Sequence, residues 1–124
     1  MKTVNLLVTD NAIASASLTF VDMVQFTNQF WKVLHPQSQA PLLQVKMYVL
    51  QGKSFRCSNG LDIPALNMSA YQPGDVVIVN PAYVYDKPRM QTYLAETQEF
   101  HPILQQESQR GAILSAYCTA TFAL

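Results

Sequence analysis

The chain has 124 residues, of which 49% are hydrophobic and 13% charged, and its eight basic and eight acidic side chains cancel. This length predicts one domain with one core, and no apolar run reaches the ~18 residues of a membrane span. The scattered lysines and arginines argue against nucleic-acid binding by this segment. Because no secretory signal pattern follows Met1, we expect a cytoplasmic protein.

The first part of the chain predicts a strand, a helix and a second strand. Residues 3–9 form a continuous apolar run that ends in the turn pair 10–11, as is typical of a central strand covered on both faces. Apolar residues then recur at three- and four-residue spacings, from a candidate N-cap at Ser17 to just before His35. Residues 42–50 are again strand-like, which completes a βαβ unit.

The middle of the chain predicts a hairpin and another strand. The Ser-Asn-Gly sequence at 58–60 separates two short extended runs, 54–57 and 61–63, and Asn-Gly is a strong hairpin signal. A Pro-Gly-Asp turn at 73–75 then leads into four β-branched residues at 76–79, which predict a buried parallel strand.

A loop and helical sequence follow. Residues 83–87 are predicted as a surface loop, in which Tyr83 and Tyr85 could either contact a partner or pack locally. Residues 89–110 have helical composition and fit one broken helix or two short ones. Gly111 stands where a left-handed helix cap is expected.

The C-terminal residues predict an elbow. The pattern indicates a buried strand at 112–116, a sharp turn at 117–119 and a helix from Ala120, so the Cys118 thiol would lie above the end of the sheet. The whole order is strand, helix, strand, hairpin, strand, helix, strand, elbow, which predicts an α/β fold with a mostly parallel sheet flanked by helices. Only about one helical turn fits before Leu124, so we expect the 124 residues to be a single, incomplete domain.

Two segments carry a resemblance to a known family. Residues 73–79 and 111–124 resemble the N-terminal domain of one group of AraC-type transcription regulators, which is similar to PfpI-type (DJ/PfpI-like) proteases and class I glutamine amidotransferases. The regulators' elbow reads G-x-x-(I/L)-x-x-x-C-T-G-x-F-x-L, and this chain matches it except at Ala120, where the family has glycine. The hairpin at 58–61 also fits.

The resemblance implies a flavodoxin-like or amidotransferase-like fold and a homodimer that senses an unknown small-molecule effector. It also implies a DNA-binding helix-turn-helix domain, which is not among these residues.

Three roles are open for Cys118. The favoured one is a non-catalytic ligand pocket at the carboxyl ends of the strands, lined by Asp10, Asn80, Cys118 and Thr119. The second is a buried, inert thiol, because free cysteine packs as a small hydrophobe. The third is a catalytic thiolate, as in a cysteine-dependent small-molecule hydrolase or deglycase of the PfpI-like superfamily.

Three departures from the superfamily argue against catalysis. Its hydrolases often have a histidine after the cysteine, where this chain has Thr119, and a carboxylate near the first helix, where only Asp22 is available. Pro81 stands where a glycine N–H usually completes the oxyanion hole, and proline has no N–H. Losing one such donor costs roughly 100–1000-fold in rate. We therefore predict that the domain is not an enzyme.

The remaining cysteine and the histidines predict no metal or cofactor site. Cys57 and Cys118 are expected to be free thiols in a reducing cytoplasm. His35 and His101 each stand beside a proline and have no partner at ligand spacing.

Aromatic residues raise the question of partner surfaces. The predicted first helix contains Phe20, Phe26, Phe30 and Trp31. Packing of this helix on the sheet explains most of them, with a partner surface as the alternative. Exposure of Phe122 and Leu124 at the unfinished elbow helix predicts self-association.

Overall fold

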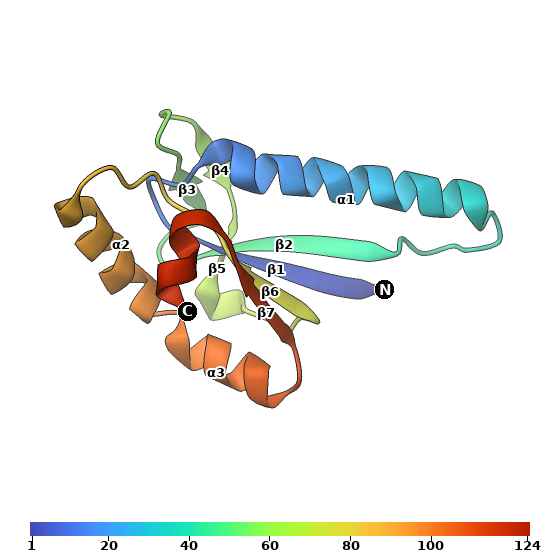
Figure 1. Ribbon diagram of the computed structural model, residues 1–124. Helices are drawn as coiled ribbons and strands as arrows, with labels where there is room; N and C mark the ends of the chain where they lie inside the picture. The colour runs from blue at the N-terminus through green and yellow to red at the C-terminus, as the bar shows by residue number, and fades with distance from the viewer.

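A five-stranded parallel sheet forms the centre of the molecule (Figure 1). The computed structural model describes all residues from Met1 to Leu124. The strands of this sheet are β1 (Lys2–Val8), β2 (Leu43–Val49), β5 (Leu66–Asn67), β6 (Val76–Val79) and β7 (Ile113–Ala116). Their order is β5-β2-β1-β6-β7, and every neighbouring pair is parallel. The predicted α/β class, the parallel sheet and the central position of the first strand are therefore confirmed.

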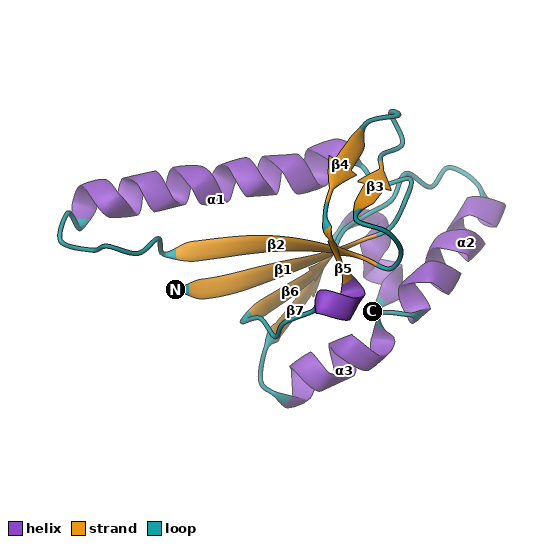
Figure 2. Ribbon diagram, turned by 180° about the vertical axis from the view of Figure 1, so that it is seen from behind, coloured by secondary structure: helices purple, strands orange, loops and turns teal.

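Helices cover both faces of the sheet (Figures 1 and 2). The helices are α1 (Ala14–Leu34), α2 (Lys87–Gln98), α3 (His101–Gln109) and the terminal 3-10 helix η2 (Cys118–Ala123). On the α1 side, Leu6 and Ile78 belong to a buried cluster that Phe20 packs against. On the other side, Phe100 and Leu104 share a cluster with η2. Each fully buried side chain of this size stabilises the fold by about 1.5–3 kcal/mol.

The helical region before Gly111 consists of two short helices. Pro102 lies in the first turn of α3, as predicted, because its missing N–H is not needed there. Gly111 has a φ of +89°, which confirms the left-handed cap.

The predicted hairpin is confirmed. Strands β3 (Ser54–Arg56) and β4 (Asp62–Pro64) pair antiparallel and form a separate two-stranded sheet. The Ser58 N–H donates to the Ala12 carbonyl at 2.9 Å, which ties the hairpin to the start of α1. Strand β5 and the 3-10 helix η1 (Met68–Ala70) were not predicted, because they are too short to show a periodic pattern.

The start of α1 differs from the prediction. The helix begins at Ala14, so Ser17 is not its N-cap; Ser17 is buried and its hydroxyl donates to the Ala14 carbonyl. The Ile13 N–H donates to the Pro81 carbonyl at 3.2 Å. This tertiary contact positions the start of the helix where the local sequence offers no capping side chain.

Not all the aromatic residues of α1 face the sheet. Phe20 packs against the core, whereas Phe26 and Phe30 are 62% and 69% exposed. Trp31 is half-buried and stacks on His35 with ring centroids 3.7 Å apart. The apolar spacing in this helix forms two stripes, and one sheet can cover only one of them. The expectation that sheet packing explains most of these residues is therefore wrong for Phe26 and Phe30.

The last strand and the elbow differ in two respects from the prediction. Strand β7 has β6 as its only neighbour, so it is an edge strand, and Ile113 is 65% exposed rather than buried. The helix predicted from Ala120 is the 3-10 helix η2, and it begins at Cys118. None of the helices has the length and apolar character needed to cross a bilayer.

Candidate functional site

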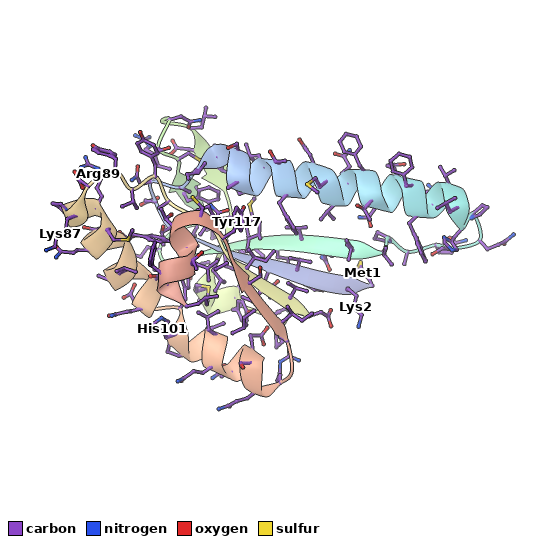
Figure 3. All side chains as sticks on the ribbon, in the orientation of Figure 1. Met1, Lys2, Lys87, Arg89, His101 and Tyr117 are labelled. Carbon is purple, nitrogen blue, oxygen red and sulfur yellow. The ribbon has the colours of Figure 1, made fainter.

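The strand-to-helix elbow holds Cys118 in an unusual backbone conformation. Its φ of +55° is rare for a residue other than glycine and costs roughly 1–3 kcal/mol. Side-chain hydrogen bonds fix the residues on either side: the Tyr117 hydroxyl donates to the Ala16 carbonyl at 3.0 Å, and the Thr119 hydroxyl donates to the Ala82 carbonyl at 2.8 Å. Tyr117 extends from the elbow toward the start of α1 (Figure 3). The predicted elbow therefore exists and is anchored to the first turn of α1 and to the segment that follows β6.

The elbow hollow is the open depression beside Cys118, between α1 and the β6–β7 edge. Its lining residues are Ile13, Ser15, Ala16, Thr19, Phe20, Met23, Ile78, Pro81, Ser115, Tyr117 and Cys118. None of these residues is a carboxylate, histidine, lysine or arginine. The hollow therefore offers no general base for the thiol and no charged partner for a thiolate.

The surroundings of Cys118 bear on two of its three predicted roles, the buried thiol and the catalytic thiolate. Cys118 is exposed, so the expectation that its thiol is buried is wrong, and its reactivity stays a prediction. Pro81 lines the same hollow, where it can donate no N–H. Asp22 is exposed and does not line the hollow.

The structure does not bring the four predicted ligand residues into one cavity. Asn80 is buried, and its side-chain amide donates to the Pro81 carbonyl at 3.1 Å. The backbone carbonyl of Asn80 accepts a hydrogen bond from the Tyr93 hydroxyl. With the Thr119 hydroxyl bound to a backbone carbonyl, Asn80 and Thr119 both use their side chains to hold loops. Of the four residues, Cys118 lines the elbow hollow and Asp10 lines another cavity, and a ligand contact of all four stays a prediction.

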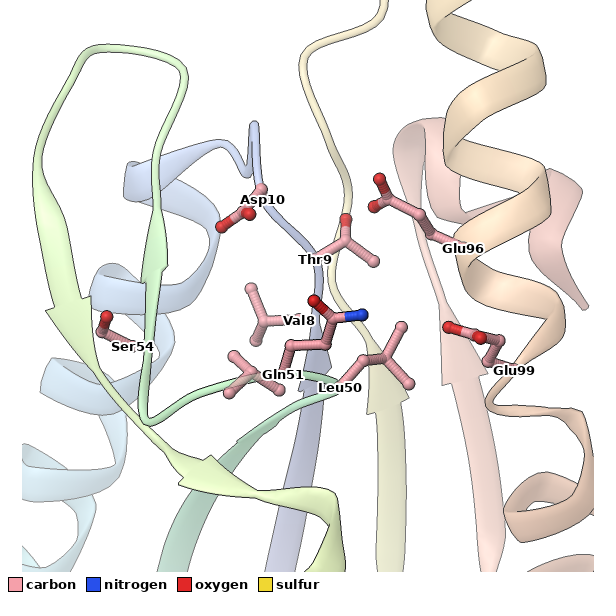
Figure 4. A pocket seen from close by; sticks show the side chains of 9 residues that line it. Val8, Thr9, Asp10, Leu50, Gln51, Ser54, Glu96 and Glu99 are labelled. Atoms are coloured by element: carbon pink, nitrogen blue, oxygen red, sulfur yellow. The ribbon is translucent and has the colours of Figure 1, made fainter.

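Asp10 lies in a second cavity, which we call the carboxylate pocket (Figure 4). This pocket has a volume of about 150 Å³. Its lining residues are Val8, Thr9, Asp10, Val49, Leu50, Gln51, Ser54, Glu96 and Glu99. Residues from the carboxyl ends of β1 and β2 form one side, and the C-terminal end of α2 forms the other. This is the end of a parallel sheet at which open α/β folds bind ligands.

Three carboxylates line the carboxylate pocket without an ion pair; Asp10 and Glu99 are exposed and Glu96 is half-buried. Asp10, Glu96 and Glu99 take part in none of the four salt bridges of the molecule, and no lysine, arginine or histidine lines the pocket. The Asp10 carboxylate accepts one backbone N–H, from Arg56, at 2.9 Å. Burial raises the pKa of Glu96, and the negative charges of Asp10 and Glu99 raise it further.

Thr9, a lining residue of this pocket, has a polar atom without a partner that is shielded from solvent. Thr9 is 5% exposed, and its hydroxyl oxygen forms no hydrogen bond. Sequence reasoning found Asp10 but missed Thr9, Glu96 and Glu99. A signal existed for the two glutamates, because they stand at the C-terminal end of a helix, where the helix dipole disfavours negative charge.

Comparison with solved structures places this architecture among known folds. No protein-family model matches the chain, and no curated protein matches it. The structure is similar to an AraC family transcriptional regulator from Pseudomonas putida, with a TM-score of 0.62 and 16% identity, over 94% of this chain and 64% of that one. It is similar to Drosophila melanogaster DJ-1beta, with a TM-score of 0.72 and 16% identity, over 99% of this chain and 58% of that one. The chain has the DJ-1/PfpI fold.

A bacterial DJ-1 relative gives the same result. The DJ-1 superfamily protein Atu0886 from Agrobacterium tumefaciens matches with a TM-score of 0.69 and 10% identity, over 99% of this chain and 56% of that one. This chain thus spans between 56% and 64% of the length of these three DJ-1/PfpI-fold proteins. At identities this low, the structural similarity establishes only the fold. Any activity has to be inferred from the residues of the site.

Other candidate residues have local roles in this DJ-1/PfpI fold. The His101 ring contacts the Ala123 carbonyl at 3.0 Å, and no group of three or more His, Cys, Asp or Glu side chains has metal-binding geometry. Cys57 is buried, which raises the pKa of its thiol, and neither cysteine is in a disulfide. Tyr83 and Tyr85 are exposed as predicted, with ring centroids 5.4 Å apart. A partner contact by these tyrosines stays a prediction.

Proposed function

We propose that the chain is the effector-sensing and dimerisation domain of an AraC-type transcription regulator, is cytoplasmic, and has no catalysis of its own. DNA binding would belong to a helix-turn-helix domain outside these 124 residues. The observation that carries the proposal is the lining of the elbow hollow, where an exposed thiol has no acid, base or cation beside it. The likeness to an AraC family regulator supports the choice among DJ-1/PfpI-fold functions.

Thiol chemistry on an acyl group requires more than an exposed cysteine. The thiol must lose its proton to a base, and N–H donors must stabilise the oxyanion. Around Cys118 the residue at the expected oxyanion position is Pro81, and the nearest helical residues that line the hollow are Ser15, Ala16 and Thr19. None of these groups is a base of suitable strength, so the elbow is better suited to holding the structure than to turnover.

Regulation in this proposal works through a shift between two arrangements of a dimer. An effector can shift that equilibrium only by the difference between its affinities for the two states. Phe122 and Leu124 are 70% and 55% exposed near the C-terminus, which supports the predicted self-association. Light scattering is expected to give a mass above that of one chain, and a strictly monomeric species would count against the dimer.

The catalytic part of the proposal is tested by comparing the chain with its Cys118→Ser variant on an activated ester, with Cys57→Ser as the matched control. We expect all three proteins to give the same low rate. The regulatory part is tested by reading the gene in frame beyond the codon for Leu124. A basic helix-turn-helix is expected there, whereas a stop codon soon after a completed α/β domain would contradict a regulator.

A second candidate function is a cysteine-dependent hydrolase or deglycase. The positive φ of the exposed Cys118 favours it, because strained backbone conformations occur preferentially at functional sites. A rate that Cys118→Ser abolishes and Cys57→Ser leaves intact would establish this function in place of the regulator.

A further inference from the structure

The outer side of α1 has an apolar row that no other element covers. The row, which we call the outer seam, consists of Met23, Phe26, Phe30 and Val33, and their exposed fractions lie between 60% and 74%. The helix contacts the sheet through its other side, on which Val24 is buried. Nothing lies over the outer side in either view of the molecule (Figures 1 and 2). Contiguous exposed apolar surface of this kind marks an interaction site.

The spacing of the outer seam is that of a coiled coil. Its four residues follow one another at intervals of three, four and three, which is the a and d pattern of a heptad repeat. Ala16 and Thr19 continue the same spacing toward the start of α1. A helix that only covers a sheet needs one apolar stripe, and α1 already has one on its sheet-facing side. The second stripe therefore predicts a helix as the partner.

The rotation of α1 about its axis is fixed by hydrogen bonds on the sheet-facing side. The side-chain amide of Asn28 donates to the Leu43 carbonyl, and its oxygen accepts from the Leu43 N–H, both at 2.9 Å. These bonds tie the middle of the helix to the start of β2. The outer seam thus cannot turn toward the sheet, and only another molecule or another segment can cover it.

The outer seam is complementary to a second copy of itself. If two α1 helices lie antiparallel about a two-fold axis level with residue 28, Phe26 of one copy faces Phe30 of the other. Met23 then faces Val33, so the contact is the same from both sides, as a two-fold interface requires. The charged residue next to the seam is Asp22, and this arrangement separates the two Asp22 side chains by about 18 Å along the axis. A parallel pair would place them at one level.

The exposed area suits a dimer better than a membrane surface. Leu34 is 73% exposed beside the seam. Five side chains of this size at these exposed fractions offer on the order of 600 Å² per copy, or about 1,200 Å² for a pair, which reaches the lower end of specific interfaces. Helices that lie on membranes have polar faces rich in lysine and arginine, whereas the one basic residue of α1 is Lys32.

We propose that two copies of the chain dimerise through the outer seams of their α1 helices, packed antiparallel. This inference rests on the dimer of the proposed function and names the contact that forms it. Met23 also lines the elbow hollow, so the contact between the copies and the hollow beside Cys118 share a side chain.

Sedimentation equilibrium of the 124-residue chain tests the contact. Phe26→Glu and Phe30→Glu are each expected to raise the dissociation constant of the dimer by about 30-fold or more, because each change buries an unpaired carboxylate twice in the symmetric interface. Gln25→Glu is the matched control on the same helix, outside the seam, and leaves the constant unchanged. Circular dichroism is expected to show the same helix content in all variants, because these positions are exposed in the single chain.

A charge pair tests the antiparallel direction. Combining Phe26→Glu with Phe30→Lys places each new carboxylate opposite a new ammonium group of the other copy. At low salt we expect this variant to dimerise at least about 10-fold more tightly than the combination of Phe26→Glu with Phe30→Glu, and added salt should reduce the difference. In a parallel pair each new charge would face its own kind, and the lysine variant would show no rescue.

Three results would overturn the inference. They are a dimer with the same dissociation constant in both single seam variants, a dimer that Phe122→Ser dissociates and the seam variants do not, and a single chain that binds phosphatidylglycerol vesicles through the seam. The first two leave the dimer of the proposed function intact, so they count against this contact alone. A chain that stays monomeric throughout contradicts both the contact and the dimer, and the reading of the gene beyond Leu124 still decides whether the protein is a regulator.

Discussion

The two acidic regions at opposite ends of the sheet treat their carboxylates differently. Near the start of β6, Glu107 is 2% exposed and accepts hydrogen bonds from the Gly74 N–H at 2.8 Å, the Tyr71 hydroxyl at 3.0 Å and the Arg110 guanidinium at 3.0 Å. Burial raises the pKa of Glu107, but these donors outweigh burial and hold it below its usual value.

The carboxylate pocket at the carboxyl end of the sheet has no comparable donors. The pKa of Glu96 is shifted upward, opposite to that of Glu107. The contrast shows that the chain supplies three hydrogen-bond donors to Glu107, whereas it supplies one to Asp10 and none to the side chains of Glu96 and Glu99.

The largest expected effect comes from removing the Glu107 carboxylate, which accepts three hydrogen bonds. Glu107→Ala removes the acceptor of the buried Gly74 N–H, the half-buried Tyr71 hydroxyl and the exposed Arg110 guanidinium, so we expect the free energy of unfolding to fall by about 3–5 kcal/mol in urea denaturation. Glu99→Ala is the matched control and is expected to change stability by less than about 0.5 kcal/mol. Equal effects of the two variants would contradict the comparison.

A methyl group beside the same network should have the next largest effect. A Cβ on Gly74 would lie 2.7 Å from the amide nitrogen of the buried Asn5, so Gly74→Ala is expected to cost about 1–3 kcal/mol. The cost should shrink when Asn5→Ala is also present, because the clashing amide is then absent. A cost that is unchanged in that background would show that the strain arises elsewhere.

In the carboxylate pocket a substitution is expected to raise the free energy of unfolding instead of lowering it. Thr9→Val removes a buried hydroxyl without a partner, so we expect the ligand-free protein to become more stable by about 1 kcal/mol. Thr97→Val is the matched control, because the hydroxyl of Thr97 donates to the Tyr93 carbonyl at 3.0 Å and its loss should destabilise. Destabilisation by Thr9→Val in thermal and urea unfolding would mean that the hydroxyl is already satisfied.

The smallest expected effect depends on pH. Because the pKa of Glu96 is raised in the folded protein, its ionisation costs stability at neutral pH, and this cost disappears as the pH falls below the unfolded pKa of about 4.3. Glu96→Gln should therefore stabilise the ligand-free protein by up to about 0.5 kcal/mol at pH 7 and have no effect in acid. A gain that persists at low pH would contradict this cause.

For Glu107 the sign is opposite. Its lowered pKa contributes stability above the unfolded pKa, and that contribution is lost as the pH falls through the folded value. One pH series of urea unfolding curves therefore distinguishes the two glutamates, because their contributions to the free energy of unfolding change in opposite directions with pH.

Local patterns predicted the elements whose geometry is set by neighbouring residues. The valine-rich strand at 76–79, the Asn-Gly hairpin and the left-handed Gly111 all follow from short-range rules. Predictions failed where distant residues decide. The Pro81 carbonyl positions the start of α1, and the sheet covers one stripe of that helix and leaves Phe30 exposed.

The candidate site also has parts set by neighbouring residues and parts set by distant ones. The elbow and Cys118 were visible in the sequence because strand, turn and helix are contiguous. The carboxylate pocket was visible only through Asp10, since α2 approaches β1 through the packing of the whole sheet. Sequence spacing alone could not bring Glu96 and Glu99 to that side chain.

The most direct test of the account is to measure how fast the Cys118 thiol of the folded chain is alkylated by iodoacetamide at neutral pH. Mass spectrometry would follow the reaction in the Cys57→Ser variant, in which Cys118 is the one remaining thiol. The account predicts a rate no faster than that of free cysteine, because no base or cation lines the elbow hollow. Alkylation much faster than that of free cysteine would show an activated thiolate and contradict the account.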